Sequence, residues 1–202
     1  MNALDYIVNS MMTVILIVGS YQFYFYPQRE HRRTPVEYRS RIDELIPFAP
    51  GWVWIYTVLY YPVIVLGVLT IDTFAKFNYT AFSFIMLLAM HMLIFYFYPV
   101  RTPAEWREYK LESLSTRFLA FIQRYDAPLN CFPSMHVSVA TLTALHLHNN
   151  LTPFVGQYAV LIYFFPVLIA ISSVCTKQHY FADVVTGPIL GYVNFKLFEL
   201  FS

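Results

Sequence analysis

The sequence predicts an all-α membrane protein, a six-transmembrane-helix bundle with interfacial amphipathic helices in its loops. Of the 202 residues, 58% are hydrophobic and only 12% are charged, whereas soluble domains carry about 25% charged residues. The apolar residues gather into runs of roughly 20, the length that an α-helix needs to cross the hydrocarbon core. Aromatic residues such as Trp52, Trp54 and Tyr98 crowd the ends of these runs, as they do at the level of the lipid headgroups.

Six segments qualify as spans, and no long linker divides them, so residues 1–202 are expected to form a single integral membrane domain. The expected spans are Tyr6–Tyr26, Gly51–Ile71, Asn78–Tyr98, Pro133–His148, Thr152–Ser172 and Ala182–Phe201. Pro62 and Pro166 are expected to kink the second and fifth spans. The N-terminus has no basic region and no A-x-A cleavage site, so we interpret Met1–Tyr26 as a retained span rather than a signal peptide.

Six crossings would place the loops at 27–50, 99–132 and 173–181 together on one face of the membrane. That face would carry every Lys and Arg residue except Lys76 and Lys196. The positive-inside rule therefore favours a cytoplasmic location for these loops. Any Lys or Arg residues that bind phosphate on this face would be there for chemistry, and they would weaken the count of positive charges as evidence for topology.

Two loop segments carry a helix-start pattern, in which Thr34-Pro35 and Thr102-Pro103 are each followed by a glutamate two residues after the proline. Threonine serves as the N-cap, proline suits the first helical position, and glutamate completes a capping box. From Pro103 to about Tyr125, aromatic and basic residues interleave at near-helical spacing. This spacing predicts a basic amphipathic helix in the interface plane, with a helix simply packed on the bundle as the alternative.

The remaining composition excludes several classes of site. A formal net charge of +1 gives no indication of a nucleic-acid partner. Two cysteines, Cys131 and Cys175, are too few for a disulfide framework or a thiolate metal site. We interpret them as small buried residues, with a bridge between them as the less favoured alternative. The expected partners are the bilayer and a lipid, and the oligomeric state stays open.

The phrase CFPSMH at 131–136 opens the fourth span. Proline suits the first helical turn, where its missing N–H has no cost. The free backbone N–H groups and the helix dipole at such an end attract an anion. Ser134 adds a hydroxyl donor, and His136 lies on the same first turn.

A second phrase, TKQHYFADVVTG at 176–187, opens the sixth span. His179 and Asp183 are four residues apart and share one helical face. The carboxylate can fix the imidazole tautomer and leave the other ring nitrogen free to attack. Lys177 and Arg101 fall on the same face of the membrane and can supply positive charge. Two histidines, a carboxylate and these cations at one depth favour phosphoryl transfer through a phosphohistidine.

At these residues the chain resembles the type 2 phosphatidic acid phosphatase superfamily. Its motifs are Lys-x6-Arg-Pro, Pro-Ser-Gly-His and Ser-Arg-x5-His-x3-Asp. The second motif is matched with Met135 in place of glycine, and the third is matched with Ser173 in place of arginine. The first is poorly matched, because Arg101-Thr102-Pro103 has one residue inserted and Ile94 occupies the lysine position. The wording of both phrases is most similar to the branch of inositol phosphorylceramide and sphingomyelin synthases.

The resemblance implies a metal-independent enzyme without a cofactor. In it, His179 is the nucleophile, Asp183 orients and activates it, and His136 protonates the departing alkoxide. The phosphate oxygens would be held by Ser134, Lys177 and Arg101. The resemblance also favours a site on the extracytoplasmic or lumenal face, against the charge count.

On family frequency, the resemblance implies a lipid phosphate phosphatase of the phosphatidic acid or isoprenyl diphosphate type. The first alternative is a phosphodiester headgroup transferase of the sphingolipid-synthase kind. A phosphomonoester carries a charge of about −1.5 to −2 at neutral pH, so a pocket with few cations suits a singly charged diester. The second alternative is a catalytically silent lipid-binding protein, which the degraded first motif suggests.

Overall fold

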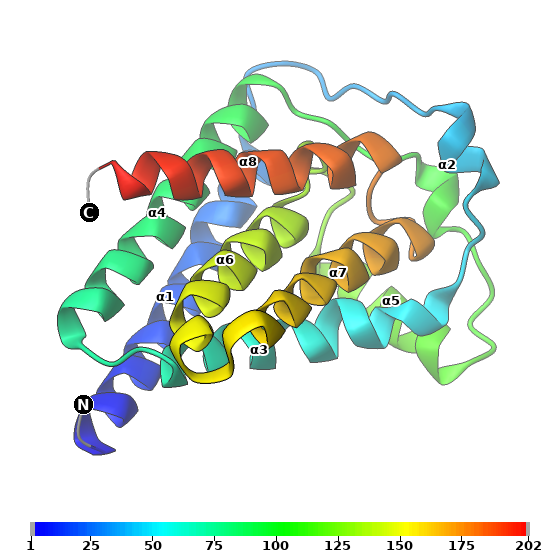
Figure 1. Cartoon of the computed structure of the whole chain (residues 1–202). Coiled ribbons are helices and arrows are strands. Elements are labelled where there is room, and N and C mark those ends of the chain that lie inside the picture. The colour runs from blue at the N-terminus through cyan, green and yellow to red at the C-terminus, as the bar shows by residue number, and fades with distance from the viewer. Residues whose placement is uncertain (1–2, 201–202) are drawn as a thin grey trace.

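The computed structural model describes residues 3–200, which form helices and no strand, so the predicted all-α class is confirmed (Figure 1). The α-helices are α1 (Ala3–Arg29), α2 (Arg41–Leu45), α3 (Tyr60–Leu69), α4 (Phe74–Phe97), α5 (Leu114–Tyr125), α6 (Met135–Val155), α7 (Phe164–Cys175) and α8 (Phe181–Glu199). Shorter helical turns are the 3₁₀ turns η1 (Pro50–Trp52), η3 (Ala104–Arg107) and η4 (Gly156–Tyr163) and the π turn η2 (Ile55–Leu59).

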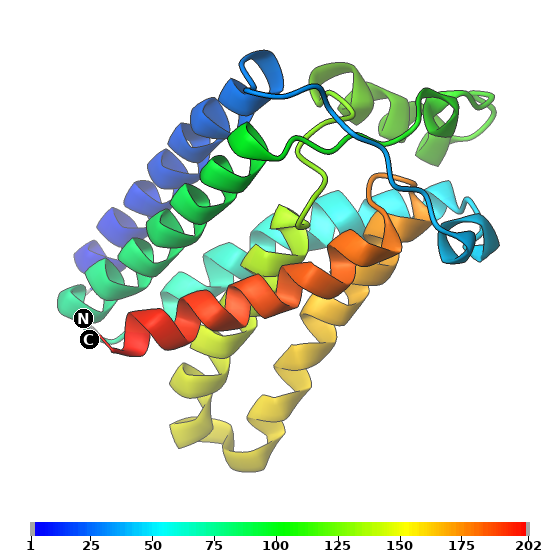
Figure 2. The same ribbon diagram turned by 90° about the horizontal axis from the view of Figure 1, so that it is seen from above.

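Within the described residues, four helical segments are long and apolar enough to cross a membrane, in agreement with an integral membrane protein. These segments are Ala3–Arg29, Pro50–Leu69, Phe74–Phe97 and Met135–Cys175. The last contains α6 and α7, which reverse direction through η4 and lie side by side (Figure 2). Helix α8 is not among the four, and the end of its expected span, Phe201, lies outside the described residues. The count of six spans therefore stays a prediction.

Helix α6 lies at the centre of the bundle, where it packs against α3, α4, α7 and α8. Two glycines allow α8 to approach it closely. A Cβ atom at Gly187 would come 2.8 Å from the carbonyl oxygen of Ser134, and one at Gly191 would come 2.6 Å from that of Ser138. Small residues let helix backbones approach in membranes. The hydroxyl of Ser138 adds a hydrogen bond of 2.8 Å to the carbonyl oxygen of Gly187.

Both prolines expected to kink spans stand just after a departure from α-helical geometry. Proline has no N–H for the carbonyl four residues earlier, and its ring crowds that carbonyl. The residue four before Pro62 is Val58, which lies inside the π turn η2. The residue four before Pro166 is Ile162, which lies inside the 3₁₀ turn η4. The π turn also carries the buried Tyr56.

The expected helix start at Thr34 was wrong. Residues near it are extended instead, and Val36 pairs with Val100 in a short parallel bridge. The N–H of Val36 donates to the carbonyl oxygen of Pro99 at 3.1 Å. Helix α2 begins later, where Ser40 and Asp43 form a complete capping box.

The single helix expected from Pro103 to Tyr125 was also wrong, because it is divided into η3 and α5. Ser113 caps α5 by accepting from the N–H of Thr116 at 3.1 Å, and this local cap starts a new helix after an irregular segment. Helix α5 is amphipathic: Leu119 is buried, whereas Arg117 on another face is exposed. Its position in a membrane interface stays a prediction.

The three loops that the six-span prediction placed on one face lie together at one end of the bundle (Figure 2). The N–H of Arg32 donates to the carbonyl oxygen of Tyr96 at 3.0 Å, which joins the ends of α1 and α4. The N–H of Ala49 donates to the carbonyl oxygen of Cys175 at 2.8 Å. The first turns of α6 and α8 begin at this same end.

Candidate functional site

The first turn of α8 holds the imidazole of His179 in one tautomer. Nδ1 of His179 lies 3.0 Å from the carbonyl oxygen of Cys131 and 3.3 Å from Oδ2 of Asp183. Both partners can only accept, so Nδ1 carries the hydrogen and Nε2 keeps its lone pair. The ring is therefore oriented as a nucleophile requires.

Asp183 is fully buried, and donors hold both of its oxygens. Oδ2 accepts from the backbone N–H of Tyr180 at 2.9 Å, and Oδ1 accepts from the hydroxyl of Tyr38. Burial and the adjacent carboxylate raise the pKa of Tyr38, so this phenol stays a donor. Donors to both oxygens therefore fix the orientation of the Asp183 carboxyl group.

The first turn of α6 brings His136 next to His179, with ring centroids 6.2 Å apart. Nδ1 of His136 lies 2.9 Å from the hydroxyl of Tyr56, and the two ring centroids lie 4.4 Å apart with their planes tilted by 34°. Tyr60 contacts the imidazole at a centroid distance of 5.1 Å. Tyr56 comes from the π turn η2, a type of distortion that recurs at functional sites.

Ser134 is buried at the N-cap of α6, where its hydroxyl accepts from the N–H of Val137 at 3.5 Å. Its own N–H donates to the carbonyl oxygen of Asp183 at 3.0 Å. The structure therefore brings Ser134, His136, His179 and Asp183 together.

The two cations expected beside them are engaged elsewhere. Nζ of Lys177 donates to the carbonyl oxygens of Asp43 and Ile46, at 2.7 and 2.6 Å, at the end of α2. Arg101 is half exposed and forms an ion pair of 2.8 Å with Glu37. In this structure these cations hold loop segments.

Arg107, which was expected only as one cation of a surface helix, lies beside His179. Both line a polar pocket of about 10 Å³, room for roughly one water molecule. The guanidinium donates through Nη1 to the carbonyl oxygens of Gln123 and Asp126, at 3.0 and 2.6 Å. Within the described part of the chain, its buried Nε has no hydrogen-bond partner, and neither has Nε2 of Gln178 in the same pocket.

Asp126 also lines this pocket, and residues of α1 hold its side chain. Its Oδ1 accepts from Nε2 of Gln28 at 2.7 Å and from the hydroxyl of Tyr24 at 3.2 Å. Burial raises the pKa of the Asp126 carboxyl, while the hydrogen bond from Gln28 and the charge of Arg107 lower it. Burial likewise lowers the pKa of Arg107, and Asp126 counteracts this. The guanidinium remains protonated.

One comparison with known proteins gives a match. A model of the PAP2 superfamily matches residues 46–197, well over half of the chain. The chain belongs to the PAP2 superfamily. No curated protein and no solved structure gives a match. Within this PAP2 member, the two well-matched motifs form the first turns of α6 and α8, whereas Arg101 of the poorly matched first motif is paired with Glu37.

Sequence reasoning missed Arg107, Tyr38 and Tyr56, and only the first left any signal. The signal is that Arg107 belongs to a run of interleaved basic residues. Its side chain reaches the C-terminus of α5, where the helix dipole favours a cation. The two tyrosines were not distinguishable among the 17 tyrosines of the chain.

Proposed function

We propose that this PAP2 member is a metal-independent lipid phosphatase, acting on phosphatidic acid or an isoprenyl diphosphate through a phosphohistidine. The observation that carries the proposal is the orientation of His179. Its Nδ1 is held by Asp183 and a backbone carbonyl, its Nε2 is free to attack, and a second imidazole lies 6.2 Å away.

In the first step, Nε2 of His179 attacks phosphorus, and the bond from phosphorus to the lipid oxygen breaks. The attacking ring becomes positively charged, and the buried Asp183 carboxylate stabilises that charge. In the substrate complex His136 is the imidazolium: its Nδ1–H donates to the hydroxyl oxygen of Tyr56, and its Nε2 carries the second hydrogen. His136 transfers this proton to the departing alkoxide.

In the second step, His136 now accepts a proton from water, whose oxygen attacks the phosphoryl group. The bond from phosphorus to Nε2 of His179 breaks, and inorganic phosphate leaves. Both histidines return to their starting protonation states, so protons and charge balance over the cycle.

The negative phosphate is attracted by the N-termini of α6 and α8, which meet at this point. Arg107 is the cation that lines the pocket of His179, and its unpartnered Nε can donate to a phosphate oxygen. Lys177 and Arg101 would act indirectly, by holding the loops around the site.

A labelled-lipid assay on the purified protein tests the proposal. Phosphatidic acid and an isoprenyl diphosphate, each labelled in phosphate, are incubated with the protein, and products are separated by thin-layer chromatography. Release of free phosphate that is lost in His179→Ala supports the phosphatase. The absence of turnover with either lipid and with phospholipid–ceramide pairs would instead indicate a silent lipid-binding member.

A second candidate is headgroup transfer between lipids through a phosphodiester intermediate. The observation that favours it is the engagement of Lys177 and Arg101 outside the site, which leaves Arg107 as the cation lining the small pocket. One guanidinium matches the single charge of a diester better than the larger charge of a monoester. Labelled headgroup appearing on ceramide, without free phosphate, would favour this candidate.

A further inference from the structure

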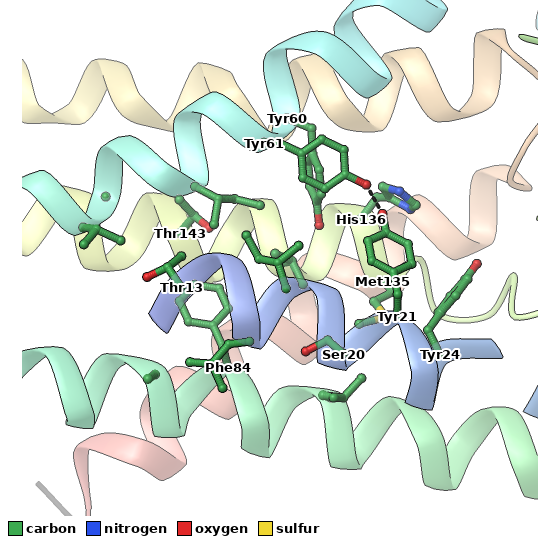
Figure 3. A pocket seen from close by; sticks show the side chains of 18 of the residues that line it. Thr13, Ser20, Tyr21, Tyr24, Tyr60, Tyr61, Phe84, Met135, His136 and Thr143 are labelled. Atoms are coloured by element: carbon green, nitrogen blue, oxygen red, sulfur yellow. Dashed lines mark hydrogen bonds between the residues drawn. The ribbon is translucent and has the colours of Figure 1, made fainter. Parts of the chain in front are cut away.

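An apolar chamber of about 390 Å³ extends through the bundle from the candidate site. Its walls come from α1, η2, α3, α4, α5 and α6. His136 lies at one end (Figure 3), and Tyr56, which also lines the chamber, is hydrogen-bonded to it. At the other end lies Asn150, whose Nδ2 donates to the hydroxyl of Thr70 at 3.0 Å. Along α6, the distance from His136 to Asn150 is about 20 Å at 1.5 Å per residue.

We propose that this chamber binds one apolar chain of the lipid whose phosphate reacts at His136 and His179, an inference that rests on the proposed function. Half of a bilayer's hydrocarbon core is roughly 15 Å thick, so the chamber is long enough for one ordinary chain. Its volume is near the lower end of the 300–1,000 Å³ typical of small-molecule sites, which fits one chain rather than two.

Helix α1 makes one wall of the chamber and lies outside residues 46–197, the part that the family model matches. Leu16, Ile17 and Phe25 line the chamber from α1. The hydroxyls of Tyr21 and Tyr61 are hydrogen-bonded to each other, which ties α1 to α3 near His136 (Figure 3). Helix α1 is therefore held as a wall of the chamber at the end near His136.

The deep half of the chamber can be filled by substitution. Gly67 of α3 lines the chamber, and a Cβ atom there would meet only Cγ of Leu147, at 4.0 Å. Ala81 of α4 lines the chamber from another helix. Gly19 of α1 provides the matched control, because a Cβ atom there meets nothing within 4 Å and the residue is not part of the chamber wall.

Dependence on chain length tests the proposal in Gly67→Phe and Ala81→Phe. Release of phosphate is measured with dioctanoyl and dioleoyl phosphatidic acid. Each buried methylene contributes several-fold to affinity, so both variants should lose about tenfold or more of kcat/KM for the long-chain lipid and little for the short-chain lipid. Gly19→Phe should have the same kcat/KM as the parent protein for both lipids. Equal losses for both lipids in the two chamber variants would overturn the proposal.

Photocrosslinking provides a readout that does not need turnover. A phosphatidic acid with a diazirine at the end of one chain is added to the protein in nanodiscs, and labelled residues are mapped by mass spectrometry. Label should reach Thr143 and Leu147, which face the chamber, and should disappear in Gly67→Phe but not in Gly19→Phe. Label confined to the exposed Ile15 and Val18 would overturn the proposal.

The two measurements separate failure of the chamber from failure of the proposed function. If the chamber residues are labelled but no lipid is turned over, the chamber binds a lipid chain and the proposed phosphatase activity is wrong. If the protein releases phosphate but shows neither chain-length dependence nor labelling of the chamber residues, the phosphatase activity stands and the proposed chain-binding chamber is wrong.

Discussion

The backbone N–H of Ser134 donates to the carbonyl oxygen of Asp183 across 3.0 Å. This bond joins the first turn of α6, which carries His136, to the first turn of α8, which carries Asp183 and is preceded by His179. The separation of the two imidazoles is thus set by how closely two helices pack. Gly187 and Gly191 determine that packing, because larger residues would collide with the α6 backbone.

Gly191→Ala should therefore impair both stability and turnover. The new methyl group would come 2.6 Å from the carbonyl oxygen of Ser138, and overpacking of this kind costs about 1–3 kcal/mol. Thermal unfolding in detergent and phosphate release provide the two readouts. Gly19→Ala, which meets nothing within 4 Å, is the control. Unchanged behaviour of Gly191→Ala would show that the helices are not packed as described.

Tyr56→Phe should lower turnover by about 10²-fold or more, because a positioned proton donor or acceptor contributes about 10²–10⁴-fold and the hydroxyl of Tyr56 positions His136 through Nδ1. Phenylalanine keeps the ring that contacts His136, so the unfolding temperature should change little. Tyr79→Phe, on the exposed face of α4, removes a hydroxyl far from His136. Equal activity of Tyr56→Phe and Tyr79→Phe would show that the hydroxyl of Tyr56 does not support turnover.

Arg107 and Lys177 should differ in what their loss affects. Arg107→Met should reduce turnover strongly, because the guanidinium lines the pocket of His179. Lys177→Met should mainly destabilise the protein, by about 1–3 kcal/mol, because the ammonium holds two carbonyl oxygens near α2. Lys110→Met, at an exposed ion pair, serves as the control. A larger loss of turnover in Lys177→Met than in Arg107→Met would restore the lysine as the phosphate ligand.

The two free cysteines should differ in reactivity. Cys131 is 2% exposed, and burial together with the charge of Asp183 raises the pKa of its thiol well above 9.0. Because the pKa is raised, the thiol stays protonated through neutral pH, and raising the pH to about 9 should still leave it unlabelled. Cys175 is partly exposed and should react with a maleimide. In intact cells, an impermeant maleimide at Cys175 would then report the face of the site.

The parts of the site that sequence predicted are those fixed by local geometry. His179 and Asp183 are one helical turn apart, and Ser134 and His136 share the first turn of α6, so short spacings determined both pairs. Tyr38, by contrast, reaches Asp183 from a segment 145 positions earlier in the chain. Its path depends on the bridge between Val36 and Val100, which no local pattern revealed.

Lys177 shows how proximity in sequence misleads. It is two residues from His179, but its φ of 56° is left-handed, and its side chain reaches the end of α2. Arg107 was hidden for the opposite reason. The break between η3 and α5 separates it from the surface helix in which the spacing had placed it, and its side chain then reaches the C-terminus of α5. The all-α class was thus predictable, but the path of the loops was not.

The most direct test of the central claim is to trap the phosphoryl group on the protein. An aryl phosphate has a leaving group that needs no proton, so His136→Ala should still be phosphorylated but slow to release phosphate. After proteolytic digestion without acid, mass spectrometry should find the phosphoryl group on His179 of this variant. The double variant His136→Ala/His179→Ala should carry no phosphoryl group. A phosphoryl group on another residue, or full turnover in His179→Ala, would contradict the account.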